Sequence, residues 1–441
     1  MRYLISGYYG EKNAGDEAIL AGILQEIERR DPEASFVVLS FDPEDTEARH
    51  AQGRDLVAIP SSLRLQRSLR LVMKGCDLLI SGGGSFLHEA DFALYGRSFL
   101  FREGKLRPVP YFLTIVLLAR SVGLPVMWYA QGLGPLHTWA ARRLVAVAAS
   151  VSQVVTWRDR DSALLAAEIG VRPPVQLVVP DPAYGLDPAV AGEADRVLAE
   201  AGLALEGARG SRPRFLAACP RPWLGRTGFL EALGEVLEEV AAHLDLDVLL
   251  VPFHEIQDPV VCQGLAARPA VAGRAHVLPP QPNPTVLAAV LGQAEFALTM
   301  RLHSGILAAV AGTPAVILDY DPKTRAFAQQ TRQTAWAISV DDLEDKACRS
   351  KAKAALLEAI RQTAYNLTER RRQLERVVAP LRAEAGRTSA LAVQLAAGGF
   401  APYSRLAAGG AATSRSGAWP AGAPLEGSPG GPSAPPGPRQ P

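Results

Sequence analysis

Residues 299–325 of the chain read TMRLHSGILAAVAGTPAVILDYDPKTR and, together with the short buried strand expected at 296–299, form a strand–helix–strand pattern. The stretch starts at the end of a short apolar run, continues into an apolar helix at 304–310 and ends with an apolar strand at 315–318. Two strands joined through one helix are expected to be parallel, with a right-handed crossover. The start of the helix and the end of the second strand then share one edge of the sheet. His303 and Lys323 are therefore expected to be neighbours.

Three basic side chains fall at this edge, namely Arg301, His303 and Lys323. Open α/β sheets bind ligands at the carboxyl ends of their strands. A helix N-terminus attracts anions, and an imidazole can gain or lose a proton near neutral pH. The stretch therefore predicts an anion site that contains a group able to transfer protons.

The rest of the chain repeats this alternation of short apolar strands and helices. The pattern predicts the α/β class, with two Rossmann-like parallel-sheet domains that face a cleft. A chain of 441 residues is also long enough for two hydrophobic cores. The expected parts are an N-terminal domain at 1–187, a C-terminal domain at 188–345, a helical segment at 346–398 and a disordered Gly/Ala/Pro/Ser-rich tail at 399–441.

Two boundaries within this scheme rest on proline and glycine. Residues 181–192 contain two prolines and two glycines, which suits a hinge between the domains. The helical segment contains Pro380, where we expect a kink or a break because proline lacks the N–H that a helix needs.

Composition excludes several classes of protein. The net charge of +1 gives no reason to expect a nucleic-acid partner. The four cysteines form no CxxC pair, so neither a zinc site nor a disulfide framework is indicated. No signal peptide is apparent, and the most apolar window, 111–130, is interrupted by Arg, Gly and Pro. We therefore expect a cytoplasmic protein.

Familiar catalytic and nucleotide motifs are also absent. The chain has no GxGxxG dinucleotide fingerprint, no P-loop and no HExxH zinc motif. The sequence after the glycine run lacks the second glycine of a nucleophile elbow. The candidate site must therefore be found from the positions of polar residues.

Many polar residues or glycines follow directly after an expected strand. They are Asn13, Asp16, Gly83, Gly84, Ser85, Gln131 and Arg158 in the first half, and Arg221, His254, Arg301, His303 and Lys323 in the second. If the strands are parallel, all of these residues converge on the cleft.

Each of these positions also has a structural explanation. Asn13 and Asp16 could turn the chain and cap the following helix. The glycines at 82–84, at an expected strand–helix junction, could form a plain turn, although such glycines also let backbone N–H groups approach an anion. His254 could be an ordinary loop histidine, and His303 could have only a structural role at the start of its helix.

A basic stripe forms a separate feature. Arg64, Arg67, Arg70 and Lys74 lie along one side of a helix expected at 63–74. Such a stripe is usually a solvated helix face, and the alternative is a surface that contacts anionic lipid head groups.

Five segments together resemble one family, the polysaccharide pyruvyl transferases of the CsaB type. They occur in the expected order and cover most of residues 1–345. The segments are GYYGEKNAGDEAIL (7–20), SGGGSFL (81–87), YAQGLGP (129–135), WRDRDSALLAAEIGV (157–171) and MRLHSGILAAVAGTPAVILDYDPK (300–323).

The resemblance implies a fold like that of GT-B glycosyltransferases and transfer of pyruvate from phosphoenolpyruvate to a sugar. The implied product is a cyclic ketal on a hexosamine, with N-acetylmannosamine as the expected sugar. The implied acceptor is a lipid-linked precursor of a cell-wall polymer that anchors S-layer proteins. Such an acceptor would bring the protein to the inner face of the membrane as a peripheral contact.

The candidate residues fit this reaction. Phosphoenolpyruvate carries a phosphate and a carboxylate, which arginine and lysine side chains bind well. No metal and no cofactor are required, because phosphoenolpyruvate is a co-substrate. The expected roles are donor binding by Arg301, Lys323, Arg221 and Arg158, acid/base catalysis by His303 and Asp16, and acceptor or cleft contacts by Asn13, Gly83, Gly84, Ser85, Gln131 and His254.

Two other functions remain open at this point. A GT-B-type nucleotide-sugar enzyme, either a glycosyltransferase or a 2-epimerase, would use the same cationic cleft for a nucleotide. A non-catalytic scaffold that binds sugars or anions would need the cations but not the acid/base role of His303.

Overall fold

The computed structural model describes residues 1–61, 66–89, 100–102, 105–203, 214–280 and 283–399. The chain divides into a compact unit, Met1–Ala401, and a second unit, Pro402–Pro441, which lies outside the described residues. Two sequence predictions lie in whole or in part outside the described residues: the disordered tail beyond residue 399 and the position of Arg64 in the basic stripe.

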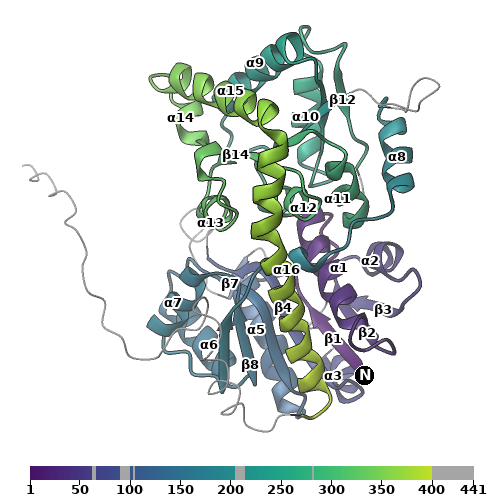
Figure 1. Cartoon of the computed structure of the whole chain (residues 1–441). Coiled ribbons are helices and arrows are strands. Elements are labelled where there is room, and N and C mark those ends of the chain that lie inside the picture. Colours follow the sequence, from purple (N-terminus) through teal and green to yellow (C-terminus); the bar gives the residue numbers. More distant parts are fainter. Residues whose placement is uncertain (62–65, 90–99, 103–104, 204–213, 281–282, 400–441) are drawn as a thin grey trace, which may run out of the picture. The chain divides into compact units, whose positions relative to one another are not determined.

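The first sheet has seven strands in the order β3-β2-β1-β4-β7-β8-β9, and all its neighbouring strands are parallel (Figure 1). The chain order reverses between β1 and β4, which is where parallel sheets open a crevice for ligands. The strands are β1 Arg2–Ser6, β2 Ser35–Ser40, β3 Asp55–Pro60, β4 Leu78–Leu87, β7 Val126–Leu133, β8 Val154–Trp157 and β9 Val175–Val178.

The second sheet has six parallel strands in the order β12-β11-β10-β13-β14-β15. Its chain order reverses between β10 and β13. The strands are β10 Phe215–Cys219, β11 Asp247–Leu250, β12 Ala275–Val277, β13 Phe296–Thr299, β14 Ala315–Asp319 and β15 Ala337–Ser339. A short antiparallel pair, β5 Phe101–Arg102 and β6 Lys105–Leu106, stands apart from both sheets. The α/β class with two parallel sheets is therefore confirmed.

Helices and short 3-10 turns connect the strands. On the first-sheet side they are α1 Ala14–Glu28, α2 Pro43–His50, α3 Gln66–Lys74, α5 Pro108–Ser121, α6 Trp139–Ser150, α7 Arg160–Glu168 and η2 Pro182–Gly185. On the second-sheet side they are α8 Ala191–Glu200, α9 Gly228–His243, α10 Asp258–Ala266, α11 Pro284–Gly292, α12 Leu302–Val310, α13 Pro322–Gln330, η3 Thr334–Trp336 and α14 Val340–Glu344. None of the described helices is both long and apolar enough to cross a membrane.

The glycine run at 82–84 lies inside a strand, so its expected position at a strand–helix junction is wrong. β4 continues through the glycines to Leu87, and β7 likewise continues through Gln131 to Leu133. Gly83 has a φ of +76°, and a Cβ there would lie 2.0 Å from Cγ2 of Ile19 in α1. The run therefore lets α1 pack directly on the backbone of β4, which a side chain would prevent.

This close packing gives a stability prediction for Gly83→Ala. The methyl group would collide with Ile19 and force a left-handed backbone on alanine, so we expect a loss of about 2–5 kcal/mol in unfolding free energy. Gly53→Ala is the matched control, because Gly53 has a φ of +72° but open space around its Cα. That variant should lose only about 1–2 kcal/mol. Urea unfolding measures both, and equal losses would show that packing on Ile19 is not the cause.

The C-terminal segment consists of two helices, α15 Arg349–Tyr365 and α16 Leu367–Ala396. The break falls at Asn366, whereas α16 runs continuously through Pro380, so the expected break at Pro380 is wrong. Val378, two residues before the proline, is buried in the core and supports the helix there.

α16 connects the two sides of the molecule. It contacts α12 as well as η2, α1 and β4 (Figure 1). On the first-sheet side, Oγ of Ser389 lies 2.5 Å from the hydroxyl of buried Tyr129. The connection at 181–192, expected as a hinge, starts with the buried turn η2, which packs against α1 and α16.

Candidate active site

The carboxyl edges of the two sheets meet at the loop that precedes α1. Asn13 and His254 form an isolated antiparallel bridge, and the backbone N–H of Ala14 donates to the carbonyl of Phe253 at 2.8 Å. Arg49, from helix α2 that the sequence did not reveal, pairs with Glu255 at 2.7 Å. These contacts place the strand-end loops of both sheets around one site.

His303 lies at the centre of this site. A Cβ on Gly15 would lie 2.4 Å from its Nδ1, so the start of α1 approaches the imidazole closely. Its Nε2 lies 3.4 Å from Oδ2 of Asp181, and the imidazole is 14% exposed. His303 from the second sheet is therefore enclosed by groups from the first-sheet side.

Asp181 is a site residue that the sequence analysis missed. Besides His303, it accepts a hydrogen bond from Nη1 of Arg158 at 3.2 Å, and both side chains are buried. Burial raises the pKa of the Asp181 carboxyl, but the charges of His303 and Arg158 outweigh burial and lower that pKa to about 2. Asp181 is thus an ionised link between the histidine and the arginine.

Asp16 is also close enough to interact with His303, and its carboxyl has the opposite character. Nδ2 of Asn13 donates to its Oδ2 at 2.6 Å. Burial raises the pKa of Asp16 to about 6, although the charge of His303 partly opposes the shift and Glu17 adds to it. Two carboxyl groups with widely separated pKa values beside one histidine are typical of acid/base chemistry.

The raised pKa of Asp16 predicts a pH-dependent stability. Between an unfolded pKa of 3.8 and a folded pKa of about 6, the folded state binds more protons, so its stability falls as the pH rises through this window. Asp16→Asn removes this penalty. The variant should therefore unfold with up to about 3 kcal/mol more free energy than the wild type at pH 8, and with little difference at pH 4.

Urea unfolding at both pH values tests this prediction. Asp161→Asn, a change of an exposed acid in α7, is the control and should show no such pH-dependent gain. A wild-type protein with a higher unfolding free energy than Asp16→Asn at pH 8 would contradict the prediction.

Arg158 and Lys323 supply positive charge beside these acids. Nη2 of Arg158 donates a short hydrogen bond to Ser85 in β4. Burial lowers the pKa of the Lys323 ammonium and the charge of Arg158 lowers it further, while Asp321 and Asp16 oppose the shift. Within the described residues, no carboxylate forms an ion pair with Lys323. Lys323 is therefore available to a ligand.

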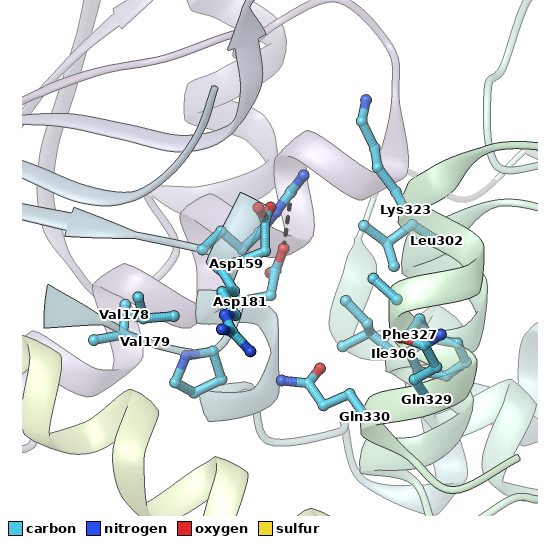
Figure 2. A pocket seen from close by; sticks show the side chains of 14 residues that line it. Asp159, Val178, Val179, Asp181, Leu302, Ile306, Lys323, Phe327, Gln329 and Gln330 are labelled. Carbon is cyan, nitrogen blue, oxygen red and sulfur yellow. Dashed lines mark hydrogen bonds and ion pairs between the residues drawn. The ribbon is translucent and has the colours of Figure 1, made fainter. Parts of the chain in front are cut away.

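A cavity of about 520 Å³ adjoins this cluster (Figure 2). In Figure 2, Asp159 and Asp181 lie on one wall, while Leu302, Phe327 and Lys323 lie on the wall formed by α12 and α13. The complete lining is Arg158, Asp159, Arg160, Val178, Val179, Pro180, Asp181, Leu302, Ile306, Lys323, Ala326, Phe327, Gln329 and Gln330. The cavity therefore brings the charged cluster next to an apolar surface.

Arg301 is committed to another partner. Its Nε and Nη2 donate to the two oxygens of Asp258 at 2.8 and 2.7 Å, and the Asp258 side chain is completely buried. Asp258 also accepts the backbone N–H groups of Phe253 and His254. The expected contact of Arg301 with the donor stays a prediction. Through Asp258, Arg301 also helps to hold the loop that contains His254.

His254 and Arg221 form a neighbouring group at the same edge. Burial lowers the pKa of His254 and the charge of Arg301 lowers it further, with a smaller contribution from Arg221. The surroundings of His254 therefore favour its neutral form. Arg221 contacts Tyr320 and Trp223 rather than the carboxylates around His303.

Gln131 and the glycines lie under the site. Gln131 is completely buried, and its Nε2 donates to the carbonyls of Gly84 and Gly132, each at 2.9 Å. Gly84 lies beside Asp16, since a Cβ there would be 3.5 Å from its Oδ1. These residues shape the floor of the site. In the described part of the chain, no group of three or more His, Cys, Asp or Glu residues is arranged to hold a metal ion.

The family model for polysaccharide pyruvyl transferase matches residues 13–322. The chain belongs to the polysaccharide pyruvyl transferase family. The matched segment includes Asp16, Arg158, Asp181 and His303. It ends one residue before Lys323. A comparison with curated proteins gave no significant match.

Solved structures with the same fold are distant in sequence. Anabaena HepE in complex with UDP-glucose has 13% identity and a TM-score of 0.54, covering 88% of this chain and 99% of its own. The UDP-GlcNAc 2-epimerase of Neisseria meningitidis bound to UDP-GlcNAc has 12% identity and a TM-score of 0.56, covering 90% and 99%. The epimerase of Methanocaldococcus jannaschii has 12% identity and a TM-score of 0.55, covering 86% and 99%. The GT-B fold of this pyruvyl transferase family member is therefore confirmed.

Proposed function

We propose that the protein transfers pyruvate from phosphoenolpyruvate to two hydroxyl groups of a saccharide and forms a cyclic ketal. The observation that carries this proposal is the double contact of Asp181, which joins His303 to Arg158 in a buried site. A proton-transferring group and a donor-binding cation are thereby held together, in a chain of the pyruvyl transferase family. In this scheme residues 188–345 form the donor side and residues 1–187 the acceptor side.

The donor needs fixed positive charge, which Arg158 and Lys323 supply from opposite sides of the site. Lys323 forms no ion pair with an acid among the described residues. The guanidinium of Arg158 is held in place by its hydrogen bond to Ser85. An arginine fork suits a carboxylate or a phosphate, and a lysine adds a point charge. We assign the carboxylate and phosphate of phosphoenolpyruvate to this pair.

Ketal formation requires two proton movements. The methylene carbon of the donor gains a proton and becomes the methyl group, while two hydroxyl oxygens bond to the central carbon and phosphate leaves. Of the two hydroxyl protons, one balances the proton on the methyl group and the other leaves with phosphate. His303, whose Nε2 lies 3.4 Å from ionised Asp181, donates a proton to the carbon, and Asp16 accepts a proton from a hydroxyl.

The acceptor is proposed to be a hexosamine, N-acetylmannosamine, in a lipid-linked precursor of a polymer that anchors S-layer proteins, as in CsaB-type enzymes. Peripheral membrane contact follows from this acceptor. α3 exposes Arg67, Arg70 and Lys74, and Leu71 beside them is 71% exposed, which suits an anionic bilayer surface. Sedimentation with anionic and neutral vesicles tests this part, and equal recovery with both would reject it.

The function itself is tested with phosphoenolpyruvate and a defined saccharide acceptor. Mass spectrometry should detect the ketal, and phosphate release should match its formation. Thermal unfolding adds a binding test, because a ligand that binds only the folded state raises the melting temperature. Stabilisation by phosphoenolpyruvate supports the proposal. Stabilisation by UDP-sugars alone, without ketal formation, would favour a nucleotide-sugar enzyme instead.

A further inference from the structure

Arg221 is a partly exposed arginine at the carboxyl edge of the second sheet. It follows β10 and is only partly exposed, yet no carboxylate in the described part of the chain pairs with it. Arg301 differs in this respect. It follows β13, the neighbouring strand in the sheet, and its charge is compensated by Asp258. A guanidinium that is withdrawn from water without a counter-charge favours the binding of an anion.

The guanidinium is held in place by two aromatic rings. Its central carbon lies 5.2 Å from the ring centre of Trp223 and 5.4 Å from that of Tyr320. The rings contact each other edge to face, with centres 4.5 Å apart. Nη1 donates to the Tyr320 hydroxyl at 3.0 Å, and Nε donates to the carbonyl of Pro222 at 3.3 Å. The remaining N–H groups of the five in a guanidinium are left for a ligand.

The loop that carries Arg221 and Trp223 has a defined conformation. Leu224 and Gly225 have φ values of +49° and +68°, and Trp223 bridges to Arg226, as in a tight two-residue turn. Arg226 pairs with Asp341, which ties the loop to α14. The aromatic partner Tyr320 follows β14 directly, so both sides of the site are attached to the sheet. A fork held in this way loses little conformational entropy on binding.

We propose that Arg221, Trp223 and Tyr320 form a second oxyanion site, which binds a phosphate-bearing group other than the donor. The site lies at the same sheet edge as the donor cation Lys323, because Tyr320 directly follows β14 and Lys323 lies in the first turn of α13. Its existence does not depend on pyruvyl transfer. Only the identity of its ligand rests on the proposed function: this ligand is the phosphate or diphosphate of an acceptor whose saccharide is bound by residues 1–187.

Titration calorimetry of the full chain with inorganic pyrophosphate tests the site. The Arg221→Gln variant should bind pyrophosphate about ten- to a hundredfold more weakly than the wild type, because it loses a charge-assisted fork. Arg214→Gln is the matched control, since Arg214 precedes β10 at its opposite end and pairs with Glu295 on the surface. It should bind as the wild type does. Lys323→Gln should weaken binding of phosphoenolpyruvate and leave that of pyrophosphate unchanged.

Two results would overturn the proposal. One is wild-type pyrophosphate affinity in Arg221→Gln. The other is an equal loss of both ligands in the Arg221 and Lys323 variants, which would place both cations in a single site. UDP and farnesyl diphosphate as further probes separate a nucleotide from a lipid source of the phosphate. If these binding results hold but no ketal forms with any acceptor, the proposed function fails and the site stands.

Discussion

Replacing His303 by glutamine should lower ketal formation about 10²–10⁴-fold, the usual contribution of a positioned acid or base. Glutamine keeps a polar group beside Asp181 but cannot deliver a proton to the methylene carbon. The donor cations Arg158 and Lys323 are untouched, so phosphoenolpyruvate should still raise the melting temperature of the variant. Phosphate release in the presence of acceptor measures turnover, and thermal unfolding measures donor binding.

His276→Gln is the matched control for this experiment. His276 is also a partly buried histidine paired with an aspartate, since its Nε2 lies 3.1 Å from Asp247, but it belongs to β12 at the sheet edge. Its replacement should leave turnover close to that of the wild type. If His303→Gln were equally active, His303 would have no part in proton transfer, and the scaffold function would regain support.

The two parallel sheets follow directly from the order of apolar segments. Strands such as Phe296–Thr299 and Ala315–Asp319 are short, apolar and separated by an amphipathic or apolar helix, and that local pattern fixes parallel pairing. The same logic placed Asp16, Arg158 and His303 at converging strand ends, where the structure brings them together. Their chemical roles stay predictions.

Asp181 was missed although the same logic applies to it. It follows the last strand of the first sheet, β9, at the start of a proline-containing connection that was interpreted as a hinge. Its importance comes from contacts with Arg158 and His303, which lie far from it in sequence. Only the folded chain shows that a carboxylate in a connection between the sheets sits beside a histidine of the second sheet.

The partners of each arginine side chain could not be predicted from the sequence either. Arg301 and Arg221 looked alike as strand-end arginines, but Asp258 compensates the charge of Arg301 and two aromatic rings hold Arg221. The glycine run likewise suggested a loop because glycine is depleted in strands. Its place in β4 depends on the close approach of Ile19 from α1, which is a tertiary contact.

Replacing Asp181 by asparagine should also reduce turnover about 10²–10⁴-fold, and it should change its pH dependence. Asparagine keeps the shape of the side chain but removes the negative charge that lies 3.4 Å from Nε2 of His303. The pH–rate profile of the variant should therefore differ from that of the wild type. The measurement is kcat against pH at saturating phosphoenolpyruvate.

Stability must be followed in the same variant. The ordinary aspartate pKa of 3.8 falls to about 2 in the folded protein, so the Asp181 carboxylate contributes stability that is present above pH 4 and is lost only as the pH falls toward 2. Asp181→Asn should accordingly lower the unfolding free energy at neutral pH, whereas Asp161→Asn, an exposed change, should not. If Asp181→Asn remains folded under the assay conditions, its loss of turnover is caused by the altered site and not by unfolding.

Asp181→Glu completes the argument, because it restores the charge but moves the carboxylate by one methylene group. We expect its pH profile to return toward that of the wild type, while its turnover stays reduced by the altered geometry around Arg158. If Asp181→Asn instead lost turnover with an unchanged pH profile, Asp181 would act only by holding η2 in place. The proton would then have to be controlled by Asp16, whose pKa of about 6 already lies close to that of a working acid or base.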